Sequence, residues 1–200
     1  MILSSLPVKI SGSCLAVTFG RFSPMTKAHI KGFLDILNHC DHLVVGIIDS
    51  YTTKVVVPVR FECFCAQADK KNDQGYTRFT LEERFAMASA ALRRFIDSGR
   101  VSVKVVPRPE YAVVQFTEMF PIDTYKVMFS GVADNQFDCE RNNIMPDLLG
   151  REVFLIKPSY EVVHNSQILD SIRKGNGQWA DIIPEDAYDI FLMYARERFL

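Results

Sequence analysis

A continuous apolar run at residues 42–48, His-Leu-Val-Val-Gly-Ile-Ile, constrains the fold more than any other feature of this sequence. A strand that is apolar at successive positions is buried on both faces, which is typical of a parallel sheet covered by helices. Further strands are expected at 14–19, 100–106, 125–130 and 152–157, each a short apolar or β-branched run. The run at 42–48 is therefore expected to belong to a sheet of about five parallel strands.

Helical patterns separate these strands. The clearest covers 80–96, where Thr80 and Glu83 have the spacing of a capping box and apolar residues recur at steps of three and four. Helices are also expected at 27–38 and at 184–199, where Pro184 is acceptable in the first turn. The alternation predicts an α/β class: a Rossmann-like doubly wound sheet with flanking helices and a C-terminal helical segment.

The length of 200 residues suits one domain spanning 1–200. Within it, 160–200 is expected to form a C-terminal helical part. The stretch 49–79 is too long for an ordinary connection and contains a candidate edge strand at 55–59. Two interpretations of this stretch stay open: a loop or insertion over the functional site, and a plain solvated loop.

Charge and cysteine content exclude several classes of function. The formal net charge is −1, which argues against a nucleic-acid-binding or membrane-surface role that depends on bulk electrostatics. No signal peptide or membrane span is evident, and five cysteines with no second paired motif support neither a disulfide framework nor a metal site. A cytoplasmic protein with no nucleic-acid, membrane or protein-bound metal partner is expected, and a nearly neutral surface permits a homo-oligomer.

The turn after the first strand contains the chemistry. Gly20 permits close approach of the backbone to a ligand, Pro24 stiffens the loop, and the N–H groups at the start of the next helix can bind an anion. Thr26 and His29 are three residues apart, so both side chains are expected to face the loop and donate hydrogen bonds to phosphate oxygens. A tight βα turn in which His29 merely caps or packs is the alternative.

These residues resemble the signature G-x-F-x-P-x-(H/T)-x-(G/A)-H of the nucleotidyltransferase (cytidylyltransferase-like) superfamily. The matching positions are Gly20, Phe22, Pro24, Thr26, Ala28 and His29. Threonine at the first of the two polar positions is most similar to nicotinamide mononucleotide adenylyltransferases. Three later segments, 79–84, 130–134 and 163–168, are similar to family segments in the same chain order. The resemblance runs from about residue 15 to 188.

The resemblance implies transfer of AMP from ATP, with Mg²⁺, to a small phosphorylated acceptor, with release of pyrophosphate. The acceptor it implies is nicotinamide mononucleotide, giving NAD. It assigns catalytic roles to His29, Thr26, Lys27 and Arg173. It assigns nucleotide binding to Phe19, Gly20, Arg21, Phe22, Ser130, Gly131, Asp134, Ser166 and Ile168. Acceptor binding is expected from Trp179, Arg84 and Tyr76, although aromatic side chains at such positions more often pack in the core.

The sequence departs from the family pattern at Leu169, where an arginine is expected to hold the β- and γ-phosphates. Arg173 lies one helical turn later and can replace it; alternatively, residues 171–173 are the true register. Two other functions stay open: a catalytically weakened nucleotide-binding sensor or assembly protein of this fold, and a transferase for another acceptor. Phosphopantetheine, FMN and a CTP-dependent reaction belong to the latter alternative.

Overall fold

The computed structural model describes residues 15–52, 61–62, 64–67, 79–125, 127–131, 136–156 and 165–199. The expected edge strand at 55–59 and the predicted site residues Tyr76 and Asp134 lie outside these ranges. Within them, no helix is both long and apolar enough to cross a membrane.

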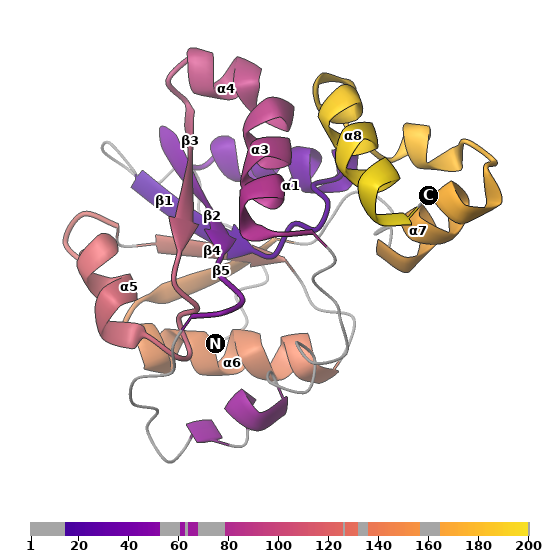
Figure 1. The fold of residues 1–200 in the computed structure, drawn as a ribbon. Coiled ribbons are helices and arrows are strands. Elements are labelled where there is room, and N and C mark those ends of the chain that lie inside the picture. The colour runs from indigo at the N-terminus through magenta and orange to yellow at the C-terminus, as the bar shows by residue number, and fades with distance from the viewer. Residues whose placement is uncertain are drawn as a thin grey trace.

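The centre of the fold is a sheet of five parallel strands (Figure 1). They are β1 (Leu15–Gly20), β2 (His42–Ile48), β3 (Val101–Val106), β4 (Val127–Gly131) and β5 (Glu152–Ile156). Their spatial order is β3-β2-β1-β4-β5. All the pairings are parallel, with Leu15 opposite His42 and Val17 opposite Met128. The order reverses between β1 and β4, the place where open α/β sheets bind ligands.

Helices connect and cover the strands. They are α1 (Lys27–Leu37), α3 (Leu81–Ala91), α4 (Arg93–Asp97), α5 (Val113–Met119), α6 (Gln136–Leu149), α7 (Asn165–Lys174) and α8 (Tyr188–Phe199). Two short 3₁₀ helices, η2 (Gln178–Asp181) and η3 (Glu185–Ala187), join α7 to α8. The predicted α/β class, a parallel sheet with flanking helices, is confirmed.

Side chains of the strands point alternately to the two faces of the sheet, and each face carries a buried apolar layer. On one face, strand residues such as Leu43 and Val45 pack with residues of α1, α3, α7 and α8. On the other, Val17 and Val44 pack with residues of α5 and α6. Figure 1 shows α3 and α6 on opposite sides of the sheet, with α7 and α8 together beside α1 and α3. The strands are thus buried on both faces, as the run at 42–48 predicts.

Two expected elements differ from the structure. The helix expected at 80–96 is divided at Leu92, whose φ of −104° and ψ of 5° leave the helical range while its side chain stays fully buried. Inside 49–79, residues 61–62 and 64–67 are helical, and Phe61, Phe64 and Cys65 are buried. A wholly solvated loop over 49–79 is therefore wrong, because part of this stretch packs against the sheet.

Candidate active site

The turn that leaves β1 is shaped by Gly20 and Phe22. Phe22 has a φ of +43°, a left-handed backbone conformation that is uncommon outside glycine. Its buried ring packs edge-on against His29 and Phe33, with centroids 5.1 and 5.5 Å away. A Cβ atom on Gly20 would lie 2.8 Å from Cζ of that ring. The glycine is therefore needed for the packing of Phe22.

Thr26 and His29 form a reciprocal cap at the start of α1. The Thr26 side chain accepts from the backbone N–H of His29 at 3.3 Å, and the Thr26 N–H donates to His29 Nδ1 at 3.0 Å. Thr26 Oγ1 also lies 2.8 Å from Nδ1. These contacts satisfy two of the otherwise unpaired N–H groups at the helix start and fix the orientation of the imidazole.

The same contacts determine the chemistry of His29. Because Nδ1 accepts a backbone hydrogen bond, the proton of the neutral ring is on Nε2. Burial lowers the pKa of His29 to about 4 from its ordinary 6.5, since a partly buried ring loses hydration of its charged form. At neutral pH His29 is thus a neutral donor through Nε2–H. That state suits hydrogen bonding to a phosphate oxygen but does not supply a positive charge.

Thr26 does not face a ligand as the sequence predicts. Its side chain is 1% exposed, and its hydroxyl is engaged with the N–H and Nδ1 of His29. The expectation that threonine and histidine both donate to phosphate is therefore corrected: Thr26 orients the imidazole. A hydroxyl that sequence reasoning missed is Ser23 Oγ, which is buried in this turn and has no hydrogen-bond partner among the described residues. Ser23 lies inside the signature at residues 20–29, and that position is the sequence signal by which it could have been singled out.

The start of α1 also contacts the C-terminal part of the chain. The backbone N–H of Lys27 donates to the Ile182 carbonyl at 2.8 Å, and its exposed ammonium group donates to the Ala180 carbonyl at 3.4 Å. Of the donors expected to form an anion site, those of Lys27 and His29 are therefore used within the protein. The Nε2–H of His29 and the ammonium group of Lys27, which can donate more than one hydrogen bond, are further polar donors at this end of α1.

Arg84 links this turn to the end of β2. It is the largest fully buried side chain among the described residues, and its Nη1 donates to the carbonyls of Arg21 and Ile48, both at 2.9 Å. Nε donates to the Thr80 carbonyl at 3.3 Å. Burial lowers the pKa of Arg84 to about 10, although the nearby charge of Asp49 opposes this shift. The structure thus uses Arg84, expected to bind the acceptor, to hold two loops.

The predicted residues of β1 and β4 lie where the strand order of the sheet reverses. Phe19, near the end of β1, packs edge-on against Phe116 of α5 at 5.3 Å. Ser130 and Gly131 end β4, and the Ser130 hydroxyl donates to Oδ1 of the buried Asn142 at 2.9 Å. The predicted nucleotide-binding residues of β1 and β4 therefore lie at the carboxyl ends of two neighbouring strands, at the same edge of the sheet.

The predicted C-terminal site residues lie on α7 and η2. Ser166 and Arg173 belong to α7, but the structure does not describe their side chains. Ile168 is fully buried in the apolar core. Trp179 packs against Tyr188 and Phe191, with centroids 5.6 and 5.5 Å away. The Ile168 side chain is thus part of the core, and one side of the partly buried Trp179 ring packs within the protein; their contacts with nucleotide and acceptor stay predictions.

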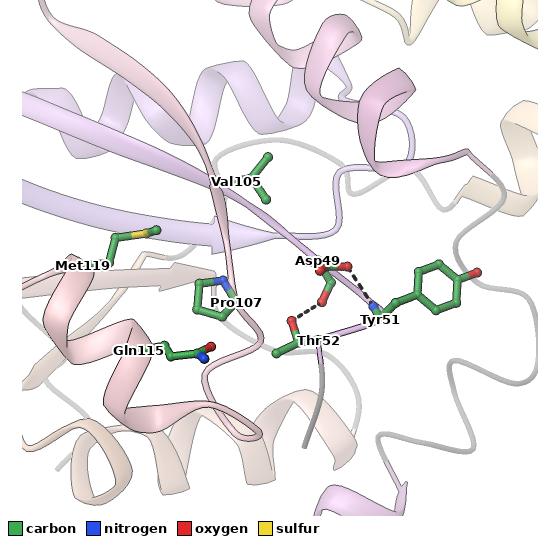
Figure 2. Close-up of a pocket in the computed structure, with 7 residues that line it drawn as sticks. All are labelled: Asp49, Tyr51, Thr52, Val105, Pro107, Gln115 and Met119. Atoms are coloured by element: carbon green, nitrogen blue, oxygen red, sulfur yellow. Dashed lines mark hydrogen bonds between the residues drawn. The ribbon is translucent and has the colours of Figure 1, made fainter. Parts of the chain in front are cut away.

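Sequence reasoning missed a pocket of about 370 Å³ at the carboxyl ends of β2 and β3 (Figure 2). Its lining residues come from the ends of these strands and from α5: Asp49, Tyr51, Thr52, Val105, Pro107, Gln115 and Met119. The Tyr51 side chain is 86% exposed, and Figure 2 shows its ring pointing away from Met119. Asp49, a polar residue directly after the buried run 42–48, lines one side of this pocket, but no single stretch of sequence predicts the pocket itself. Among the described residues, no cluster of three His, Cys, Asp or Glu side chains is arranged to hold a metal ion.

Comparison with solved structures identifies the fold. A bifunctional NMN adenylyltransferase/ADP ribose pyrophosphatase from Francisella tularensis has a TM-score of 0.53 at 13% identity, covering 82% of this chain and 43% of that chain. A structure of the bifunctional enzyme from the same organism, complexed with AMP and Mn ion, has a TM-score of 0.50 at 14% identity, covering 82% and 42%. This chain has a nucleotidyltransferase fold.

The likeness is one of fold, because sequence identity is low. The chain spans less than half the length of the solved proteins it matches. No protein-family model and no curated protein matches the sequence. Within this nucleotidyltransferase fold, the turn of residues 20–29 follows β1 and opens α1, beside the point where the strand order reverses.

Proposed function

We propose that this chain transfers AMP from ATP to a phosphate-bearing acceptor with release of pyrophosphate, and that the acceptor is nicotinamide mononucleotide, which gives NAD. The observation that carries the proposal is the His29 imidazole, held neutral at the start of α1 by its contacts with Thr26. The nucleotidyltransferase fold supports the reaction class. The sequence signature supports the choice of acceptor.

In this reaction an oxygen of the acceptor phosphate forms a bond to the α-phosphorus of ATP, and the bond between that phosphorus and the oxygen bridging to the β-phosphate breaks. The electron pair leaves with pyrophosphate. His29 Nε2–H donates to an oxygen of the α-phosphate, on which negative charge develops. A neutral donor fixed by a backbone hydrogen bond needs no reorganisation during the step. Lys27 supplies the nearby positive charge for the triphosphate.

Magnesium is proposed to arrive with ATP, bound mainly by the phosphate oxygens and water. Phe19, Gly20, Arg21 and the end of β4 are assigned to the nucleotide. We propose a single domain that acts in the cytoplasm, contacts neither nucleic acid nor a membrane, and is compatible with a homo-oligomer.

The test is pyrophosphate release by purified protein with Mg²⁺, either ATP or CTP, and a panel of acceptors that includes nicotinamide mononucleotide, FMN and phosphopantetheine. We expect release with nicotinamide mononucleotide and a loss of about 100-fold or more in His29→Ala, the usual effect of removing one such donor. His42→Gln, at the amino end of β2, is the matched control and should retain activity. Absence of pyrophosphate with every acceptor would reject the proposal, and release with CTP alone would reject ATP as donor.

A second function is favoured by Leu169, which stands where the family pattern has an arginine. Under this alternative the chain binds nucleotide as a sensor or assembly protein and turns over weakly. Calorimetry showing ATP binding without turnover would support it. Gain of turnover in Leu169→Arg would show that the missing arginine limits catalysis, whereas loss of turnover in Arg173→Ala would show that Arg173 has replaced it.

A further inference from the structure

The first residue of α1 is held by the C-terminal part of the chain. The backbone N–H of Lys27 donates to the Ile182 carbonyl at 2.8 Å, and its ammonium group donates to the Ala180 carbonyl at 3.4 Å. The Ala180 carbonyl also accepts from the Tyr188 hydroxyl. An N–H at the start of a helix has no partner within that helix, so a carbonyl from another segment can fix the first turn. Residues 180–182 therefore determine where Lys27 lies.

The segment that holds Lys27 is itself attached to α7 by one hydroxyl group. The hydroxyl of Ser171 accepts from the Trp179 N–H at 2.9 Å and donates to Oδ1 of Asn176 at 2.6 Å. The same Oδ1 accepts from the Gln178 N–H at 3.2 Å. Ser171 is 4% exposed, so these two hydrogen bonds are not readily replaced by water. Ser171 thus joins α7 both to the loop before η2 and to the second residue of η2.

The backbone between Trp179 and Ile182 is short and is held from several sides. The Trp179 carbonyl accepts from the Ile182 N–H at 3.0 Å, which closes the turn that contains Ala180. The Trp179 ring packs against α8 through Tyr188 and Phe191. This backbone is therefore hydrogen-bonded to α7 at its first residue and to the start of α1 at its last. A shift of the first residue is passed to the two carbonyls that contact α1.

On the basis of the proposed function, in which Lys27 supplies positive charge for the triphosphate, we infer that Ser171 is a positioning residue for Lys27. It acts through η2, and it lies outside the segment 163–168 that resembles the family. An ammonium group has three donors, so one hydrogen bond to Ala180 orients it and leaves two donors for phosphate oxygens. Without the Ser171 hydroxyl, η2 can shift, and a displaced charge stabilises the reacting triphosphate less.

The test is a double-mutant cycle on pyrophosphate release, measured as kcat/KM for ATP with nicotinamide mononucleotide as acceptor. We expect Ser171→Ala to lower kcat/KM about 10-fold in the wild-type chain but less than about 2-fold in a Lys27→Ala chain, because the hydroxyl acts through the ammonium group. A role in stability alone would lower kcat/KM by the same factor in both chains. Ser98→Ala, which removes an exposed hydroxyl that donates to the Phe95 carbonyl, is the matched control and should leave kcat/KM unchanged.

A second measurement needs no turnover. Hydrogen exchange at the Lys27 amide, which donates to Ile182, should accelerate about 10-fold in Ser171→Ala because η2 is loosened. Asn176 is exposed and accepts the hydrogen bond of the Ser171 hydroxyl. Asn176→Ala should therefore change exchange and kcat/KM in the same direction, and it takes the place of Ser171→Ala in both measurements if that variant does not fold.

Unchanged exchange at the Lys27 amide in both variants, or equal losses of kcat/KM with and without the Lys27 side chain, would overturn the inference. Turnover of the wild type separates this failure from failure of the proposed function. Faster exchange at Lys27 in a chain that releases no pyrophosphate rejects the transferase and keeps the link from Ser171 to Lys27. Release by the wild type, with the same kcat/KM in Ser171→Ala, keeps the transferase and rejects the positioning role.

Discussion

At the scale of single residues, one hydrogen bond to Nδ1 decides how His29 can act, and burial of its ring makes stability depend on pH. The folded chain protonates this ring near pH 4, whereas an unfolded chain does so near 6.5. Between these values the unfolded state binds more protons. The contribution of His29 to the free energy of unfolding is therefore fully present above pH 6.5 and is lost as the pH falls toward 4. The loss attributable to His29 should approach about 3 kcal/mol at pH 4.

Urea denaturation of the wild type and of His29→Gln from pH 7 to pH 4 measures this loss. Glutamine can retain the reciprocal cap with Thr26 but does not titrate. We therefore expect the free energy of unfolding of the variant to rise relative to that of the wild type as the pH falls. A constant difference in the free energy of unfolding over that range would contradict the low pKa of His29.

Gly20 is a second residue whose role can be measured alone. Adding a methyl group places Cβ 2.8 Å from the Phe22 ring, which is held between His29 and Phe33 and cannot move freely. Gly20→Ala should lower the free energy of unfolding by about 1–3 kcal/mol. In a Phe22→Leu background, Gly20→Ala should lower the free energy of unfolding clearly less, because the clashing ring is absent. Simple additivity of the two substitutions would show that the ring does not determine the need for glycine.

At the scale of elements, α8 is attached to α3 by an ion pair that also serves a helix cap. Glu83 caps α3 through Thr80 and accepts three hydrogen bonds from Arg198, at 2.9 to 3.1 Å. Arg94 and Asp186 join α4 to η3 in a much more exposed pair. We expect Arg198→Ala to lower the free energy of unfolding by about 1–2 kcal/mol and Arg94→Ala by about 0–1 kcal/mol, measured by urea denaturation. Equal losses of unfolding free energy in the two variants would mean that the bidentate contact of Arg198 with Glu83 adds nothing to the attachment of α8 to α3.

The elements also show what periodicity can and cannot predict. The strands and the start of α3 could be predicted because apolar runs and a capping box are local signals. The break at Leu92 could not, because its side chain stays in the core and the apolar period continues through it. Helix α6 has a polar sequence with Pro146 inside it, so neither composition nor period marks it as a helix. Its burial comes from Met145 and its neighbours packing on the sheet.

At the scale of the whole molecule, the candidate site combines signals that are close in sequence with contacts that are not. The signature turn predicted the neighbouring positions of Thr26 and His29, because they are three residues apart on one helix. It could not reveal that Thr26 is buried or that Lys27 meets the C-terminal segment. The aromatic ring of Trp179 suggests acceptor binding, but its contact with Phe191 of α8 depends on the fold and not on the local sequence. The pocket beside Asp49 needs three segments to come together, so no single stretch of sequence predicts it.

Arg84 joins the turn after β1 to the end of β2, which leads to a prediction for the molecule as a whole. Lysine at this position keeps a positive charge but lacks a planar fork with several donors, so at least one buried carbonyl loses its partner, at a cost of about 1–3 kcal/mol. In Arg84→Lys, hydrogen exchange should accelerate about 10-fold or more at the amides of both 20–30 and 46–52. Arg94→Lys, on the exposed surface, should leave both segments unchanged. Faster exchange in one segment alone would mean that the turn after β1 and the segment after β2 open independently, and that the hydrogen bonds of Arg84 do not couple them.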